Sequence, residues 1–209
     1  MKKFICLLAC LFAGSANATL IETDFVSAGD GLLFLDTQTN REWVDVAKTT
    51  NMSVNQFFGS SIYSGQGFQL ANQASLQELY GNAGATNISL TNNITFTAGN
   101  LPAAQLLAGL MEHSSPYSQT SGNSWIHGYM DFGSATNLTL SRFNAFGSGG
   151  TASFGINTNG TSWNFNSRHT SVGIWAYRDV TASVPEPASL ALFGLGLAGI
   201  GFSRKKKNI

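Results

Sequence analysis

The two ends of this 209-residue chain constrain its fold most, because each end combines an apolar run with basic residues. At the N-terminus two lysines precede an apolar stretch over residues 4–13, and the small residues Ala16 and Ala18 follow it. Charge, apolar run and small residues in this order are typical of a secretory signal peptide, and the run is too short to span a bilayer. We therefore predict a signal helix over residues 1–18, with Ala16 and Ala18 recognised by signal peptidase and Thr19 as the new N-terminus.

At the C-terminus, residues 188–202 form a run of fifteen residues without a charge. As a helix this run would extend about 22 Å at ~1.5 Å per residue. The hydrocarbon core of a bilayer is about 30 Å thick, so the run suits a transient transmembrane helix. Basic residues beside such a helix stay on the cytoplasmic side. The predicted membrane stop consists of Arg204, Lys205, Lys206 and Lys207.

The body between the two ends, residues 19–182, contains no cysteine, because Cys6 and Cys10 both precede the predicted cleavage site. Neither a disulfide framework nor a cysteine–zinc site is available, so stability must come from a buried core. Residues 19–187 hold five basic and eleven acidic residues, a formal charge of −6. We expect no nucleic-acid partner, because phosphate binding needs a basic face. A lipoprotein site at Cys10 is the alternative to cleavage after Ala18.

The body predicts a single β-rich α+β ectodomain with one or two short helices. One helix is expected over residues 72–81, with Asn72 as its N-cap and Gly81 at its end. A second helix is expected from Asn100, with a proline in its first turn, towards Glu112. A turn is expected over residues 37–40. Strands are expected at residues 31–36, 41–46, 125–132, 136–144, 151–157 and 171–180.

A Pro-Glu-Pro sequence lies directly before the C-terminal apolar run, and the basic cluster follows that run. This order over residues 184–207 resembles the PEP-CTERM sorting signal of Gram-negative bacteria. The resemblance implies that an exosortase, a membrane-embedded cysteine transpeptidase, recognises the motif and removes the tail. The motif residues are Val184, Pro185, Glu186 and Pro187.

The same resemblance implies a precursor held in the inner membrane through residues 188–202 and then moved to the cell surface or extracellular matrix. Proteins with this signal are associated with bacteria that produce exopolysaccharide and form biofilms. Exopolysaccharide is therefore an expected partner beside the exosortase. An ordinary C-terminal anchor that stays in place is the alternative.

A second resemblance concerns the body. Residues 36–46 are similar to the opening of many PEP-CTERM ectodomains, and residues 173–178 match their closing Gly-x-Trp-x-x-Arg. Some secreted bacterial domains with this pattern are thought to be C-type-lectin-like, which the resemblance implies here. Phe68 and Gln69 replace the family's Trp-Arg pair. The resemblance attaches no activity to the body.

Two sets of side chains have the residue types of a metal site. Asp36, Asn40 and Glu42 offer oxygens suited to calcium, with an Asx turn as the alternative. His127 and Asp131, four residues apart, would share a face of a helix and could then bind a metal. The surrounding residues favour a strand instead, so we predict no metal site and no cofactor.

Two further sets relate to carbohydrate. Paired carboxylates hydrolyse glycosidic bonds, and the available ones are Glu42, Asp45, Glu78 and Asp131. Tryptophans stack on sugars or fill cores, and the chain has Trp43, Trp125, Trp163 and Trp175. The sequence has no nucleophile elbow and no metal or cofactor signature. We therefore predict a non-enzymatic matrix or exopolysaccharide-associated protein, with a secreted glycosidase-like hydrolase as the alternative.

Overall fold

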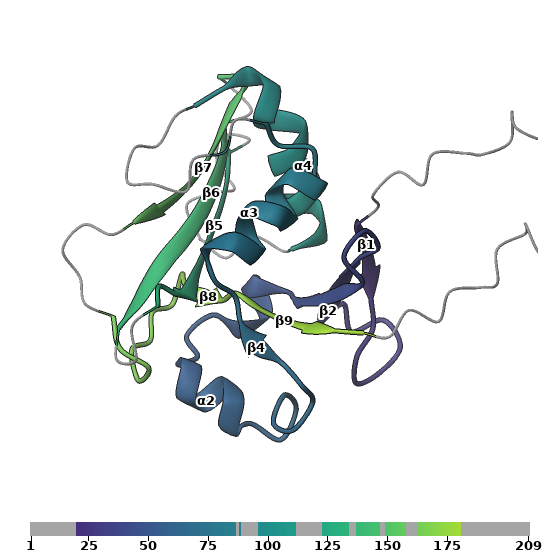
Figure 1. The fold of residues 1–209 in the computed structure, drawn as a ribbon, viewed down its shortest axis with the longest axis vertical. Helices are drawn as coiled ribbons and strands as arrows, with labels where there is room; N and C mark the ends of the chain where they lie inside the picture. The colour runs from purple at the N-terminus through teal and green to yellow at the C-terminus, as the bar shows by residue number, and fades with distance from the viewer. Residues whose placement is uncertain are drawn as a thin grey trace, which may run out of the picture.

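The computed structural model describes residues 20–86, 88, 96–111, 123–133, 137–146, 149–157 and 163–180. These residues form two β-sheets and three α-helices, which confirms the β-rich α+β prediction (Figure 1). The predicted signal helix, sorting motif and transmembrane helix lie outside the described residues. The C-type-lectin-like fold stays a prediction. None of the helices in the described ranges has the length and apolar character needed to cross a membrane.

The first sheet has five antiparallel strands in the order β1-β2-β3-β9-β4. Their bounds are β1 Leu20–Thr23, β2 Leu33–Asp36, β3 Arg41–Val44, β9 Ala176–Asp179 and β4 Gln69–Leu70. The predicted turn over residues 37–40 joins β2 to β3, and Asn40 ends it with a φ of 54°. Strand β3 is shorter than predicted, because Asp45 accepts a hydrogen bond from the Ala47 N–H and begins a 3-10 helix, η2 (Val46–Thr49).

The second sheet has four strands in the order β7-β6-β5-β8. Their bounds are β5 Asn123–Asp131, β6 Leu138–Phe146, β7 Thr151–Asn157 and β8 Gly173–Ile174. Strands β5, β6 and β7 are antiparallel neighbours, and β8 runs parallel to β5. All four were predicted as strands from the sequence. The predicted strand over residues 171–180, however, is divided between the two sheets as β8 and β9.

The pairing of residues in the four-stranded sheet shows which side chains lie on each of its two faces. Ile126, Phe143 and Phe154 lie opposite one another on the inner face, which packs against helices α3 (Gln73–Asn82) and α4 (Leu101–Leu110) in one core (Figure 1). Alternate residues point to the other side, called the outer face below. The described outer-face residues are Trp125, His127, Tyr129, Asp131, Leu138, Leu140, Arg142, Asn144, Thr151, Ser153 and Gly155.

Local signals explain the helices. Asn72 and Ser75 form a reciprocal capping box at the start of α3, and α4 begins with a proline in its first turn, as predicted. Gly81 does not end α3: the prediction was wrong there, because the helix continues to Asn82 and the chain turns only at Gly84, whose φ is +97°. Helix α2 (Val54–Gly59), which has its own capping box at Ser53, was not predicted.

Trp175 joins the two sheets at the point where the chain passes from β8 to β9. Its backbone N–H donates to the carbonyl of Tyr129 in the second sheet, and its carbonyl accepts from the N–H of Ala71 beside the first. Its indole N–H donates to the carbonyl of Ser141 at 3.2 Å. Like Trp43, Trp175 has no exposed surface, so both tryptophans serve the core rather than a sugar platform.

The close approach of Trp175 to β5 predicts a specific cost for a side chain at Gly128. A Cβ atom there would lie 2.6 Å from Trp175 Cδ1, so the indole or the strand must shift. We expect Gly128→Ala to lower the free energy of unfolding by about 1–3 kcal/mol, measured by urea denaturation of the exported protein.

Gly81→Ala is the matched control, because a Cβ at this helical position meets nothing within 4 Å. It should raise the free energy of unfolding by up to about 1 kcal/mol through helix propensity. Equal effects of the two substitutions would contradict the role given to Gly128.

Candidate functional site

The residues considered for calcium have structural partners. Asp36 accepts hydrogen bonds from backbone N–H groups of the following turn on one oxygen and from Asn82 Nδ2 at 2.7 Å on the other. Glu42 pairs with Arg178, with 2.6 Å between Oε2 and Nη2. The carbonyl of Asn40 accepts the N–H of Val180. The Asx-turn interpretation therefore describes Asp36, and across the described ranges no three His, Cys, Asp or Glu side chains are grouped to hold a metal ion.

The carboxylates considered for hydrolysis are engaged separately. Glu42 pairs with Arg178, and Glu78 pairs with Arg41. Asp45 is 1 % exposed and caps η2. Asp131 accepts the backbone N–H of Gly133 in the turn after β5. The contacts of these four carboxylates account for strand pairing, a helix cap and a turn.

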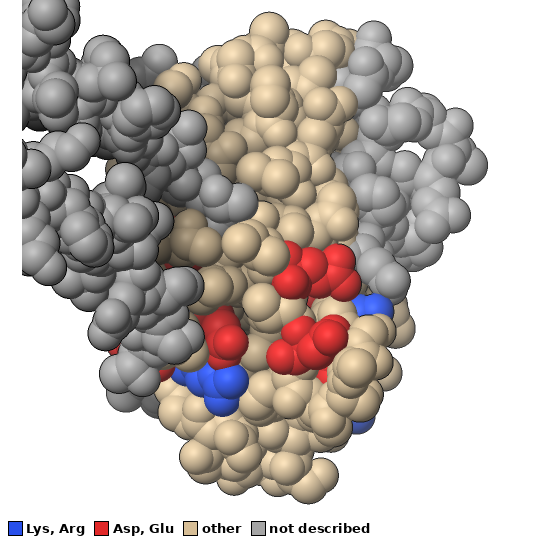
Figure 2. All heavy atoms as spheres, turned by 90° about the vertical axis from the view of Figure 1, so that its right-hand side faces the viewer, with Lys and Arg blue, Asp and Glu red and all other residues tan. Residues whose placement is uncertain are grey.

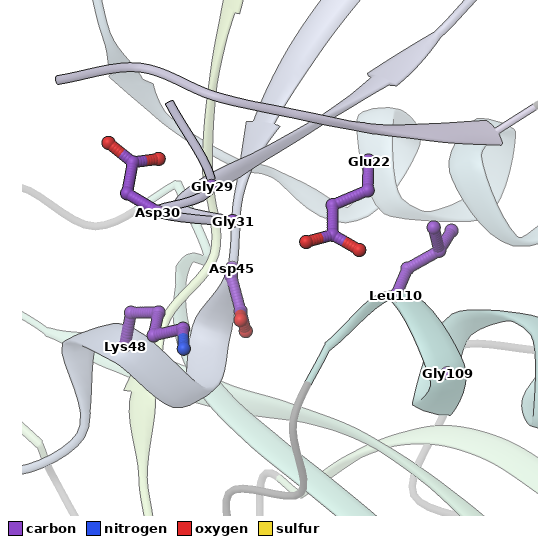
Figure 3. Close-up of a pocket in the computed structure, with 8 residues that line it drawn as sticks. All are labelled: Glu22, Gly29, Asp30, Gly31, Asp45, Lys48, Gly109 and Leu110. Atoms are coloured by element: carbon purple, nitrogen blue, oxygen red, sulfur yellow. The ribbon is translucent and has the colours of Figure 1, made fainter. Parts of the chain in front are cut away.

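A small acidic pocket lies between the β1–β2 loop, η2 and the end of α4 (Figure 3). Its volume is about 170 Å³. The carboxylate of Glu22 points into it, whereas that of Asp30 points away (Figure 3). Acidic side chains also gather on the surrounding face of the molecule (Figure 2). The lining residues are Glu22, Gly29, Asp30, Gly31, Asp45, Lys48, Gly109 and Leu110.

Asp30 organises the loop beside this pocket. Its two carboxylate oxygens accept the backbone N–H groups of Phe25, Val26, Ser27 and Leu32 at 2.7–3.1 Å. Desolvation raises the pKa of Asp30, but these four hydrogen bonds outweigh it and lower the pKa to about 2. A glycosidase acid needs a raised pKa, so Asp30 supplies fixed negative charge and no proton at neutral pH.

A different set of side chains meets on the outer face of the four-stranded sheet. Trp125 lies opposite Asn144, and His127 lies opposite Arg142, on the neighbouring strands β5 and β6. These four residues are called the outer-face quartet below. Neighbouring side chains on one face of a strand are about 7 Å apart, and opposite residues on paired strands are about 5 Å apart. The quartet therefore brings an aromatic ring, an imidazole, a guanidinium and an amide into one small area.

The rings of Trp125 and His127 lie 6.1 Å apart between centroids, tilted by 32°. Burial lowers the pKa of His127 to about 4, with the positive charge of Arg142 as the next cause, so this histidine is neutral at neutral pH. Burial also lowers the pKa of Arg142, but a guanidinium stays charged in proteins. Within the described part of the chain, Arg142 has no ion pair and its Nε has no hydrogen-bond partner.

His127 and Asp131 lie on a strand, as the surrounding residues predicted, and not on a helix face. Both residues lie on β5 and point to the outer face, with Tyr129 between them. Four residues of a strand span about 13 Å, too far to share a metal ion. Trp163 packs against Tyr129 with centroids 5.5 Å apart, so the aromatic row continues beyond the quartet.

Sequence reasoning found Trp125 and His127 as candidates but missed Arg142 and Asn144. The alternation of residues 138–146 did predict a strand. Nothing local, however, showed which residues of β5 would lie opposite Arg142, because the register of two paired strands depends on both of them.

Comparison with known proteins bears on the tail. Residues 183–205 match the family model described as the PEP-CTERM protein-sorting motif, which confirms the resemblance stated from the sequence. These residues lie outside the described part of the chain. No curated protein matches the chain. No solved structure matches it either.

The lowered pKa of His127 predicts a pH dependence of stability. The unfolded state binds a proton below about pH 6.5, whereas the folded state does so only near pH 4. The unfolded state therefore holds more protons between these values, and stability must fall as the pH falls through this window. His127→Gln should remove that part of the loss.

Urea denaturation of both proteins at pH 7.5, 6 and 5 measures the effect. The difference between the wild type and His127→Gln should change between pH 7.5 and 5. A difference that is constant across the three pH values would show that His127 is not held neutral in the fold.

Proposed function

Because the chain carries a PEP-CTERM sorting motif and is thereby marked as an exported protein sorted by an exosortase, we propose that its body is a non-catalytic module that binds exopolysaccharide. The site of binding is the outer-face quartet. The protein acts at the cell surface or in the extracellular matrix, after the tail has been removed from an inner-membrane precursor.

The quartet is the observation that carries this proposal. A sugar ring has apolar C–H faces and polar hydroxyl edges. The indole of Trp125 offers a flat apolar surface. Arg142 donates hydrogen bonds, and the neutral His127 donates and accepts them. The amide of Asn144 is 6 % exposed and donates to Ser153 Oγ at 3.5 Å, so it supports the quartet from inside the protein. A few polar groups around an apolar surface are what positions a small ligand in a binding site.

The position of the chain ends supports the same proposal. The described chain starts with β1 and ends just after β9, both in the five-stranded sheet at the right of Figure 1. Tyr129, Leu138 and Leu140 of the outer face are buried in a second core with residues of the five-stranded sheet. The quartet lies towards the other end of this face, which looks away from α3 and α4 (Figure 1). A body attached through its C-terminal end would therefore present the quartet away from the attachment point.

A secreted hydrolase is the second candidate function, and the acidic pocket is the observation that favours it. Glu22 points into this pocket, and Asp45, which also caps η2, lines it. Release of reducing sugar from exopolysaccharide by the wild type, lost in Glu22→Gln, would establish the hydrolase. An unchanged polysaccharide after prolonged incubation supports the non-catalytic module.

The sorting proposal predicts that a substitution in the Pro-Glu-Pro sequence prevents removal of the tail. Replacing Glu186 by alanine removes the central residue of the Pro-Glu-Pro sequence, so the exosortase should no longer recognise the tail. We expect full-length precursor in the inner membrane by immunoblotting, whereas the wild type loses the tail. Glu112→Ala makes the same chemical change away from the motif and should be sorted normally. Mass spectrometry that finds residues 188–209 on surface-released wild type would refute processing.

The binding step predicts a loss of affinity in Trp125→Ala. Removing the aromatic surface should weaken binding to exopolysaccharide purified from an exosortase-encoding bacterium by about tenfold, which corresponds to about 1.4 kcal/mol. Co-sedimentation measures the affinity, and thermal unfolding checks the fold. Phe132→Ala is the control, because Phe132 is 49 % exposed beside β5 but outside the quartet. Equal binding by wild type and Trp125→Ala would place the site elsewhere.

A further inference from the structure

We propose that the polysaccharide bound by the outer-face quartet is anionic, and that a carboxylate or sulfate group on it pairs with Arg142. This inference rests on the proposed function and adds the chemical class of the ligand. It follows from the position of Arg142, from the absence of a counter-charge near it in the described structure, and from the charge of the rest of the body.

Arg142 occupies the middle of the outer face. It lies on β6, the second strand of the four-stranded sheet, opposite His127 on β5 and Gly155 on β7. The glycine carries no side chain that could cover the guanidinium from the β7 side. A planar guanidinium forms two parallel hydrogen bonds with a carboxylate, and it matches the oxygens of other anions as well.

The other strand arginines show what Arg142 lacks. Arg41 pairs with Glu78 and Asp179, and Arg178 pairs with Glu42, so both neutralise carboxylates within the protein. Arg142 has no such pair within the described ranges.

Acidic side chains on the outer face are also distant from Arg142. Among the described outer-face residues, Asp131 alone is acidic. It lies four residues along β5 from His127, the residue opposite Arg142. That separation corresponds to about 13 Å, beyond the Debye length of about 8 Å at physiological ionic strength. The charge of Arg142 therefore stays available to a ligand.

His127 does not add a second charge, because burial keeps it neutral at neutral pH. The quartet thus presents one cation beside an aromatic ring and an uncharged imidazole, with the buried amide of Asn144 behind them. This combination suits a sugar that carries one negative group per ring better than a densely charged polymer, which needs several cations in a row.

The negative charge of the rest of the body predicts how selective the binding of an anionic polysaccharide is. Residues 19–187 carry a formal charge of −6, and acidic side chains gather on the face shown in Figure 2, which is turned away from the outer face. An anionic polymer is repelled by this acidic surface. Binding of such a polymer should therefore depend on the quartet rather than on general attraction.

The test compares polysaccharides that differ in charge alone. Polygalacturonate is paired with its methyl ester, and dextran sulfate is paired with dextran, so each pair separates a carboxylate or a sulfate from its neutral backbone. Full-length protein, exported and purified, is tested by affinity electrophoresis at low and high salt. We expect the charged member of at least one pair to bind at least about tenfold more tightly, with the preference weakened by salt.

Three variants assign the preference to Arg142. Arg142→Gln should lose the preference for the charged polymer, and Arg142→Lys, which keeps the charge, should retain part of it. Lys48→Gln removes an equal charge from the acidic pocket and should bind as the wild type does. Thermal unfolding confirms that each variant is folded.

The outcomes separate this inference from the proposed function. Equal binding of charged and neutral polymers, or a preference that persists in Arg142→Gln, overturns the anionic ligand. If Trp125→Ala still weakens binding in that case, the polysaccharide-binding function stands. If neither Trp125→Ala nor Arg142→Gln changes binding to any polymer, the outer face is not the site and both proposals fail.

Discussion

The contact between Trp175 and Gly128 is the constraint on which the two-sheet architecture depends. The indole lies so close to β5 that a Cβ at position 128 would meet it at 2.6 Å. From this position the backbone of Trp175 bonds to both halves of the structure. Its side chain also bonds to the carbonyl of Ser141 on β6. Trp175 thus lies at the crossover between the sheets, bonds to both halves of the structure and belongs to the main core.

This crossover also determines which parts of the sheet faces are covered by the described chain. The inner face of the four-stranded sheet is covered by α3 and α4, with Tyr80 of α3 bonded to Ser141. Part of the outer face is covered by the chain around Trp163, which pairs with Leu138. The quartet lies on the same face, further along β5 and β6. The five-stranded sheet holds both described chain ends (Figure 1).

The charged side chains differ between the five-stranded sheet and the outer face of the four-stranded sheet. The carboxylates near the five-stranded sheet are committed to structure: Glu42 and Glu78 hold arginines, Asp36 holds a turn and Asp30 holds a loop. The outer face instead carries polar groups with few carboxylates. This distribution is consistent with the proposed binding of an acidic sugar at the quartet, because an acidic surface elsewhere on the body would not attract such a ligand.

The sequence alone determined the features that depend on neighbouring residues. The apolar ends and their basic flanks, the sorting motif, the cap of α3 at Asn72, the proline-initiated α4 and the turn after Asp36 all follow from local chemistry. Tertiary structure alone decided which tryptophans are buried, where the last predicted strand divides between sheets, and that His127 faces Arg142. Burial and strand register arise from contacts between residues far apart in the chain, and no short stretch of sequence encodes the partner it will meet.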